Sequence, residues 1–142
     1  MSQAAYRAAA ATFLTDYAGF AGVTLQMYPA RPRTLFPPTG FVDRITETYT
    51  SFTEITFQRN PSVTVIVVFG TFDSKDVANQ KDDFVDGFLD WVYARGHQSG
   101  PNSLIWVSES EDLPDYVPEW LPPEQQRTYY AVRFTLEGFD SN

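Results

Sequence analysis

Few residues of this chain have the types and spacing that catalysis or metal binding requires. His97 is the single histidine, and the chain contains no cysteine. A metal site would therefore need carboxylates alone, and a thiolate nucleophile is excluded. A catalytic site also needs a base held by an orienting group, and the neighbours of His97 are Gly96 and Gln98. We interpret His97 as a solvated loop residue.

The densest group of carboxylates comprises Asp82, Asp83, Asp86 and Asp90. Their spacing places them on the polar face of an amphipathic helix, where acidic residues are expected in any case. A helix also supplies no loop carbonyls to complete a coordination shell for a divalent cation. The sequence therefore predicts a solvated face, with no metal and no cofactor.

The turn from Gly70 to Lys75 follows a predicted strand and opens a predicted helix, as a phosphate-binding loop does. It lacks a second glycine and the Gly-Lys-Ser/Thr order, and Asp73 would repel a phosphate. We therefore assign no catalytic or cofactor-binding residues and expect the protein not to be an enzyme.

Charge is spread unevenly along the chain. The net charge is −8, which argues against a basic face for duplex nucleic acid. Residues 1–60 hold five arginines and four acids, whereas residues 61–142 hold five cations and fourteen acids. This asymmetry is explained by solubility alone, or by a subunit whose arginine-bearing loops meet the acidic part of a neighbour.

Length and composition predict one domain, residues 1–142, with a core rich in aromatic rings. No apolar run approaches the roughly 20 residues of a membrane span. The N-terminus shows no basic region followed by an apolar one, so no signal peptide is expected. These features favour an intracellular product without membrane contact.

The fold is organised around residues 62–95. The run from Val63 to Phe69 is apolar almost throughout, which is typical of a strand covered on both faces. Asp73 is a candidate N-cap for a helix that reaches Arg95, with Gly96 after its end. Apolar residues recur along this helix at spacings of three and four, so we expect it to pack across the sheet.

The other elements follow from local patterns. We predict a helix over residues 3–18, stopped by Gly19, and five further strands: Val23–Tyr28, Phe41–Thr48, Phe52–Gln58, Ser103–Ser108 and Thr128–Gly138. Arg59-Asn60-Pro61 is predicted to turn the chain into the central strand. The resulting fold class is α+β, with a single mixed, mainly antiparallel sheet and two helices packed on it.

Two long segments cannot form regular structure in this prediction, because each carries four prolines: Tyr28–Phe41 and Glu109–Arg127. A stiff, extended loop loses little entropy when it docks, so both segments are candidates for subunit contacts or contacts to a partner. The candidate contact residues are Arg31, Arg33, Leu35, Phe36, Tyr116 and Trp120. The alternative is that the first segment is a connection lying along its own domain.

Three stretches, Tyr28–Ile45, Val67–Val92 and Tyr116–Phe139, resemble the tail terminator family of long-tailed, non-contractile bacteriophages, particularly those of actinobacteria. The resemblance implies a structural virion protein that forms a ring, typically a hexamer, on the end of the tail tube. Such a ring stops polymerisation of the major tail protein and presents a surface for the head-tail connector or stopper protein. DNA passes through its lumen without sequence-specific binding.

The resemblance also implies assembly in the host bacterial cytoplasm, a place at the tail end of the neck, and no active-site residues. Within the same class, the alternative is another neck component, such as a head-tail connector or head-completion protein. Two other classes remain open: an enzyme on an α/β scaffold, and a small acidic binding module.

Overall fold

The computed structural model describes residues 2–51, 57–71, 75–95, 104–138 and 140–141. It has an α+β fold, as predicted, with one mixed sheet and two long helices. The elements in chain order are α1 (Gln3–Ala21), β1 (Gln26–Tyr28), β2 (Thr39–Ser51), β3 (Phe57–Thr71), α2 (Lys75–Arg95), β4 (Leu104–Tyr116), the short 3-10 helix η1 (Pro123–Gln125), β5 (Tyr129–Gly138) and β6 (Asp140–Ser141).

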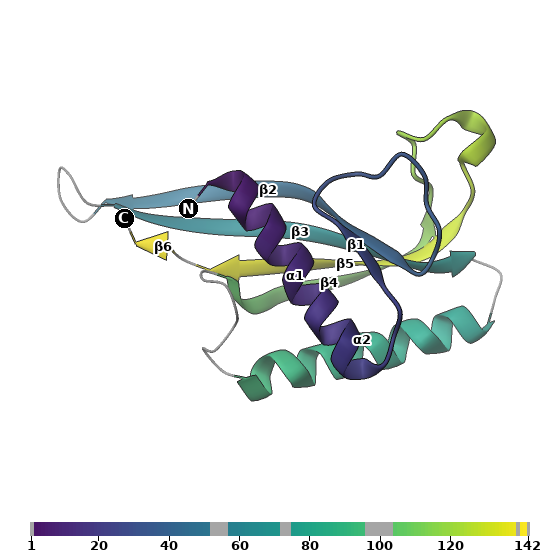
Figure 1. Ribbon diagram of the computed structural model, residues 1–142, viewed down its shortest axis with the longest axis horizontal. Helices are drawn as coiled ribbons and strands as arrows, with labels where there is room; N and C mark the ends of the chain where they lie inside the picture. Colours follow the sequence, from purple (N-terminus) through teal and green to yellow (C-terminus); the bar gives the residue numbers. More distant parts are fainter. Residues whose placement is uncertain (1, 52–56, 72–74, 96–103, 139, 142) are drawn as a thin grey trace.

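The central strand of the sheet is β3, as the apolar run predicted. The strand order is β1-β2-β3-β5-β4, and the two-residue β6 pairs with β3 beyond the end of β5. β1 runs parallel to β2, and every other pairing is antiparallel. β2 and β3 reach past both helices at the left of Figure 1. The sheet is therefore mixed but mainly antiparallel.

Side chains of β3 alternate between two cores, one on each face of the sheet. Val63, Val65 and Val67 belong to the core beneath the helices, which we call the helix-side core. Ile66 and Val68 belong to a second core on the opposite face, which we call the loop-side core. Because both faces are covered, the strand needs almost no polar side chains, and the predicted two-sided burial is confirmed.

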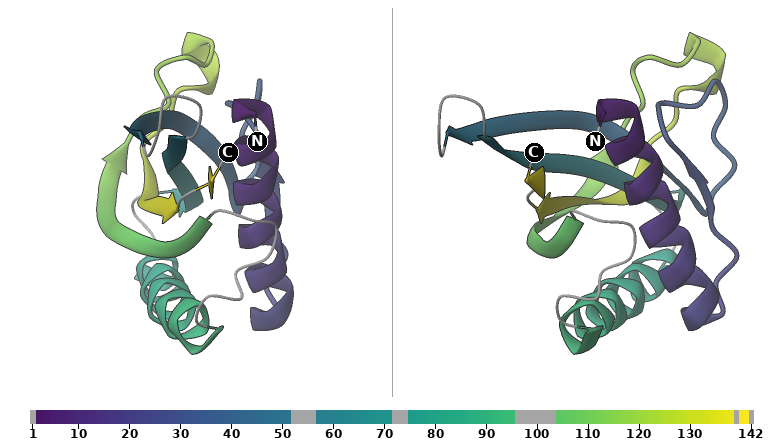
Figure 2. Two further views of the ribbon diagram at one scale, coloured as in Figure 1. Left: turned by 90° about the vertical axis from the view of Figure 1, so that its left-hand side faces the viewer. Right: turned by 60° about the vertical axis from the view of Figure 1, so that its left-hand side comes forward.

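Both helices contribute to the helix-side core and run in different directions over it (Figure 2). Five aromatic rings join them: Phe13, Tyr17, Phe84, Phe88 and Trp91. Four aspartates of α2 are exposed, as predicted: Asp82, Asp83, Asp86 and Asp90. The amphipathic spacing of both helices thus indicated correctly which side chains are buried.

The end of α1 was predicted wrongly. The helix continues through Gly19 to Ala21, and Gly22 caps it in the left-handed conformation, with φ 73°. The amide of Gly22 donates to the carbonyl of Gly19, at 3.3 Å. Either glycine would have suited the sequence pattern, but only Gly22 has the positive φ that such a cap requires.

The predicted turn at Arg59-Asn60-Pro61 is also wrong, because these residues lie inside β3. A proline inside a strand removes one ladder hydrogen bond. Here β3 pairs with β5 from Ser62 onward and with β6 only at Gln58 and Arg59. Pro61 therefore lies in a gap between the β5 and β6 ladders on one side of β3, while on the other side it lies opposite Glu47 of β2.

β4 is longer than predicted, running to Tyr116 instead of ending at Ser108. It is an edge strand that pairs with β5, and its register shifts at three places, the last between Leu113 and Tyr116. Pro114 falls in that shift. An edge strand with bulges accommodates proline and acidic residues that a central strand would not. The irregular connection is thus shorter, residues 117–128.

Other predictions fall outside the described residues: the cap Asp73, the residues around His97, and most of the predicted strand Phe52–Gln58. Neither α1 nor α2, the long helices of the described ranges, is apolar enough over its length to cross a membrane.

Candidate interaction surface

Two irregular segments cover the loop-side core, and they lie side by side in both views (Figure 1, Figure 2). We call residues 29–38 the proline arm and residues 117–128 the tryptophan loop. Each contributes a leucine to the loop-side core, Leu35 from the arm and Leu121 from the loop. The first proline-rich segment therefore lies along its own domain. The structure also shows which of its side chains are not buried in the loop-side core.

Trp120 joins the arm, the loop and the sheet. Its indole Nε1–H donates to the carbonyl of Pro32 at 3.0 Å. The guanidinium of Arg31 lies over the indole, 5.0 Å from the ring centroid. The ring of Phe41 meets the indole edge-on, with centroids 5.1 Å apart. An aromatic ring that is stacked, hydrogen-bonded and packed on the sheet holds both segments in one arrangement.

Asp43 anchors Arg31 from the sheet. The register of β2 shifts between Val42 and Arg44, and this irregularity leaves Asp43 out of the regular ladder. Its carboxylate accepts from Arg31 Nε at 3.0 Å. A bulge commonly redirects a side chain in this way. Close by, burial and then the charge of Asp43 raise the pKa of Tyr116 above its usual value, so Tyr116 stays a neutral phenol at physiological pH.

The remaining side chains of the arm face outward. Phe36 is 75% exposed, although Leu35 beside it is buried, and Arg33 is exposed. Phe36 lies at the margin of a cavity of about 690 Å³ between arm, loop and the end of β3. The apolar side chains that line it are Leu35, Phe36, Pro37, Phe69, Leu121 and Tyr129. An exposed aromatic side chain beside an apolar hollow is typical of a protein-protein contact.

The six candidate contact residues thus fall into two groups. Arg31, Leu35, Tyr116 and Trp120 make contacts within the domain and fix the shape of the surface. Arg33 and Phe36 project from it. The structure brings the two proline-rich segments together, whereas their role in binding stays a prediction.

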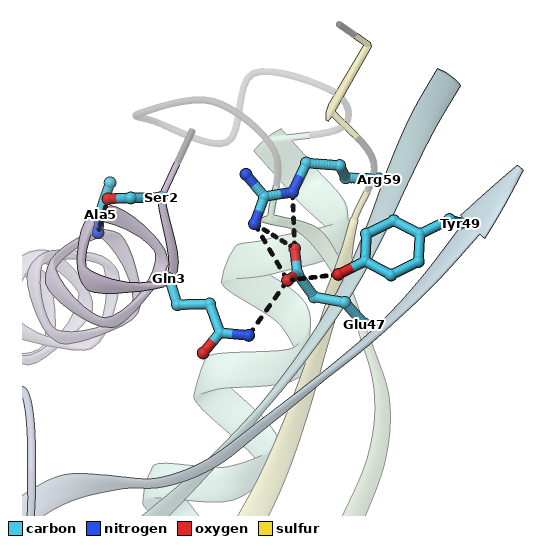
Figure 3. A network of polar contacts seen from close by, with 6 residues as sticks. All are labelled: Ser2, Gln3, Ala5, Glu47, Tyr49 and Arg59. Atoms are coloured by element: carbon cyan, nitrogen blue, oxygen red, sulfur yellow. Dashed lines mark hydrogen bonds and ion pairs between the residues drawn. The ribbon is translucent and has the colours of Figure 1, made fainter. Parts of the chain in front are cut away.

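A second polar cluster lies on the helix side, at the base of the β2–β3 hairpin (Figure 3). Glu47, whose side chain is 3% exposed, accepts from Arg59 Nε at 2.8 Å and from Arg59 Nη2 at 3.0 Å. The same carboxylate accepts from Gln3 of α1 at 3.1 Å and from Tyr49 at 3.2 Å. The network links the start of α1 to the hairpin.

Sequence reasoning missed this network. The signal was weak, because Glu47 and Arg59 are 12 positions apart on two different strands and look like ordinary surface residues. Arg59 also lies over the ring of Tyr6, 5.0 Å from its centroid. The cluster explains how the hairpin keeps a fixed direction relative to α1, and it offers no nucleophile or base for chemistry.

Lys81 is a buried cation on α2. Its side chain is 6% exposed, and its ammonium pairs with Asp82 and, at 2.8 Å, with Asp112 of β4. It also lies 5.5 Å from the ring centroid of Tyr130. Burial alone would lower the pKa of Lys81, but the two carboxylates outweigh it and raise that pKa. Lys81 therefore ties α2 to the edge strand.

Within the described ranges, no cluster of three or more histidine, cysteine or acidic residues is arranged to hold a metal ion. A smaller cavity of about 450 Å³ lies between the end of α1 and α2, beside Val23 and Pro38. No protein-family model matches the chain, and no curated protein matches it.

Proposed function

We propose that this protein is a structural subunit of a phage tail, which forms a ring on the tail tube, stops its polymerisation and provides the surface for head-tail joining. The resemblance of three stretches to the tail terminator family supports this proposal. Two of these stretches, Tyr28–Ile45 and Tyr116–Phe139, contain the proline arm and the tryptophan loop. Two of the three stretches that carry the resemblance thus contain the segments that meet at Trp120.

The geometry suits such a role physically. The arm and the loop are held by Trp120, Arg31 and Asp43, so their ordering is already complete before a partner binds. A preorganised surface loses less entropy on association than a flexible one. In the proposal, the partners are other copies of the chain, the major tail protein and the head-tail connector or stopper. No catalytic step is involved.

The proposal is tested with purified protein and preformed tubes of the major tail protein of the same phage. Negative-stain electron microscopy should show added density at one end of the tubes, and bound tubes should not elongate when more tail protein is added. Density on isolated heads and none on tubes would identify the protein as another neck component. Absence of density on both would contradict a role in the neck.

Phe36→Ala and Phe20→Ala form a matched pair for this assay. Both side chains are 75% exposed, but Phe20 lies in the last turn of α1 and Phe36 on the proline arm. Loss of an aromatic anchor costs about 2 kcal/mol, or roughly thirtyfold in affinity. We expect Phe36→Ala to weaken tube or ring association by this amount and Phe20→Ala to leave it unchanged. If the two variants had equal affinity in tube or ring association, the arm would not be part of the contact.

A further inference from the structure

The proline arm and the tryptophan loop each carry a cation that the described part of the domain does not neutralise. Arg33 and Arg127 are exposed, and no ion pair joins either of them to another residue of the described ranges. Arg127 lines the cavity beside Phe36, and the acid among the lining residues is Glu124. Phe36 and Arg127 thus line the same cavity, and exposed Arg33 lies three positions before Phe36 on the arm. We call this surface the arm end.

The outer edge of β4 has the opposite charge. Its side chains include four acids and no cation: Glu109, Glu111, Asp112 and Asp115. Glu111 pairs with Arg133 at 2.9 Å and Asp112 pairs with Lys81. Glu109 and Asp115 are exposed, and neither has an ion-pair partner in the part of the chain that the structure describes. We call this strand margin the acidic edge.

Three bulges and Pro114 also make β4 a poor template for an added strand. Such devices are how proteins protect an edge from strand-to-strand association. The acidic edge is therefore suited to contact through side chains, which is the kind of contact that the arm end offers.

We propose that the arm end of one copy docks on the acidic edge of a second copy, with Arg33 and Arg127 facing Glu109 and Asp115. The inference rests on the proposed ring and names its subunit contact. The two surfaces are different parts of the same chain, so the contact is heterologous. Each pair of copies still has one unoccupied arm end and one unoccupied acidic edge. Repetition of such a contact closes into a ring when the rotation permits. Phe36 supplies the apolar part of the contact, and the opposite charges fix the orientation of one copy relative to the other.

Charge reversal with rescue tests the pairing. The variants are Arg33→Glu/Arg127→Glu, Glu109→Arg/Asp115→Arg and the combination of all four, studied by sedimentation velocity at low and at physiological salt. Each double reversal places like charges in contact and should weaken self-association about tenfold or more. The combined variant restores opposite charges and should return to within about threefold of the wild type. Arg44→Glu is the matched control, because Arg44 is an exposed cation on β2 and belongs to neither the arm end nor the acidic edge.

The outcomes separate the inference from the proposed function. Failure of the combined variant to recover, or an equal loss in Arg44→Glu, overturns the pairing. A second outcome also overturns the pairing: reversal of the two arginines abolishes binding of the protein to tube ends, whereas the Glu109→Arg/Asp115→Arg reversal leaves that binding unchanged. This result would assign the arm end to a contact with the tail protein. A wild-type protein that neither self-associates nor binds tubes contradicts the proposed function itself.

Discussion

Gly87 in α2 occupies a position where an alanine should destabilise the fold, although alanine is the better helix former. The Tyr17 hydroxyl reaches across from α1 and donates to the carbonyl of Phe84 at 3.1 Å. A Cβ on residue 87 would collide with that hydroxyl oxygen, whereas the ring carbon Cζ of Tyr17 would lie at 3.6 Å, an ordinary contact. The conflict therefore involves one oxygen atom.

The magnitude follows from two opposing effects. Replacing glycine by alanine inside a helix gains about 1 kcal/mol. Forcing extra volume into a packed interface costs about 1–3 kcal/mol. We expect Gly87→Ala to lower the free energy of unfolding by about 1 kcal/mol. In a Tyr17→Phe background the obstruction is gone, so the same substitution should raise that free energy by about 1 kcal/mol.

Urea unfolding of the wild type, both single variants and the double variant measures this change of sign. Gly19→Ala in α1 is the control, because a Cβ there would meet nothing within 4 Å. It should show only the helix-forming gain, about 1 kcal/mol or less near a helix end. The packing of α1 on α2 described above would be refuted if Gly87→Ala stabilised the wild type as much as Gly19→Ala does.

Phe88 is fully buried against rings of α1 and against Phe134 of β5, so Phe88→Ala should reduce the free energy of unfolding by about 3–5 kcal/mol. If this variant unfolded at the same urea concentration as the wild type, the described packing of α2 would be wrong. Alkaline pH should also destabilise the fold. Burial raises the pKa of both Tyr17 and Tyr116 above the usual 10.0, so the folded state retains a proton that the unfolded chain releases. Stability is complete below pH 10.0 and falls as the pH rises further. This loss should be smaller in Tyr17→Phe and in Tyr116→Phe when melting is followed from pH 8 to 11.

The elements that sequence predicted well are those whose burial follows from local periodicity. Val63 to Phe69 has a single polar side chain, Thr64, because both of its faces are covered, and α2 presents one apolar stripe because one face is covered. Errors arose where tertiary context overrides a local signal. Pro61 reads as a turn residue, yet it lies in a gap between two ladders. Pro114 and the nearby acids read as a loop, yet they belong to a bulged edge strand.

The candidate surface was predicted only in part. Proline content identified both segments as stiff and irregular, and this is a property of the local chain. Their mutual packing rests on contacts between distant residues, such as the hydrogen bond from Trp120 to Pro32, 88 positions apart. A single sequence contains no local signal for such pairs. For the same reason the Glu47–Arg59 network, formed across a hairpin and joined to α1, escaped prediction.

The most direct test of the proposed function is the length of tail tubes in infected cells that lack this protein. The proposal predicts tubes that grow far past their normal length and bear no heads, with normal length restored when the protein is supplied from a plasmid. Electron micrographs of lysates give the length distribution. Tails of normal length that merely fail to join heads would contradict tail termination and support a head-tail connector or head-completion role instead.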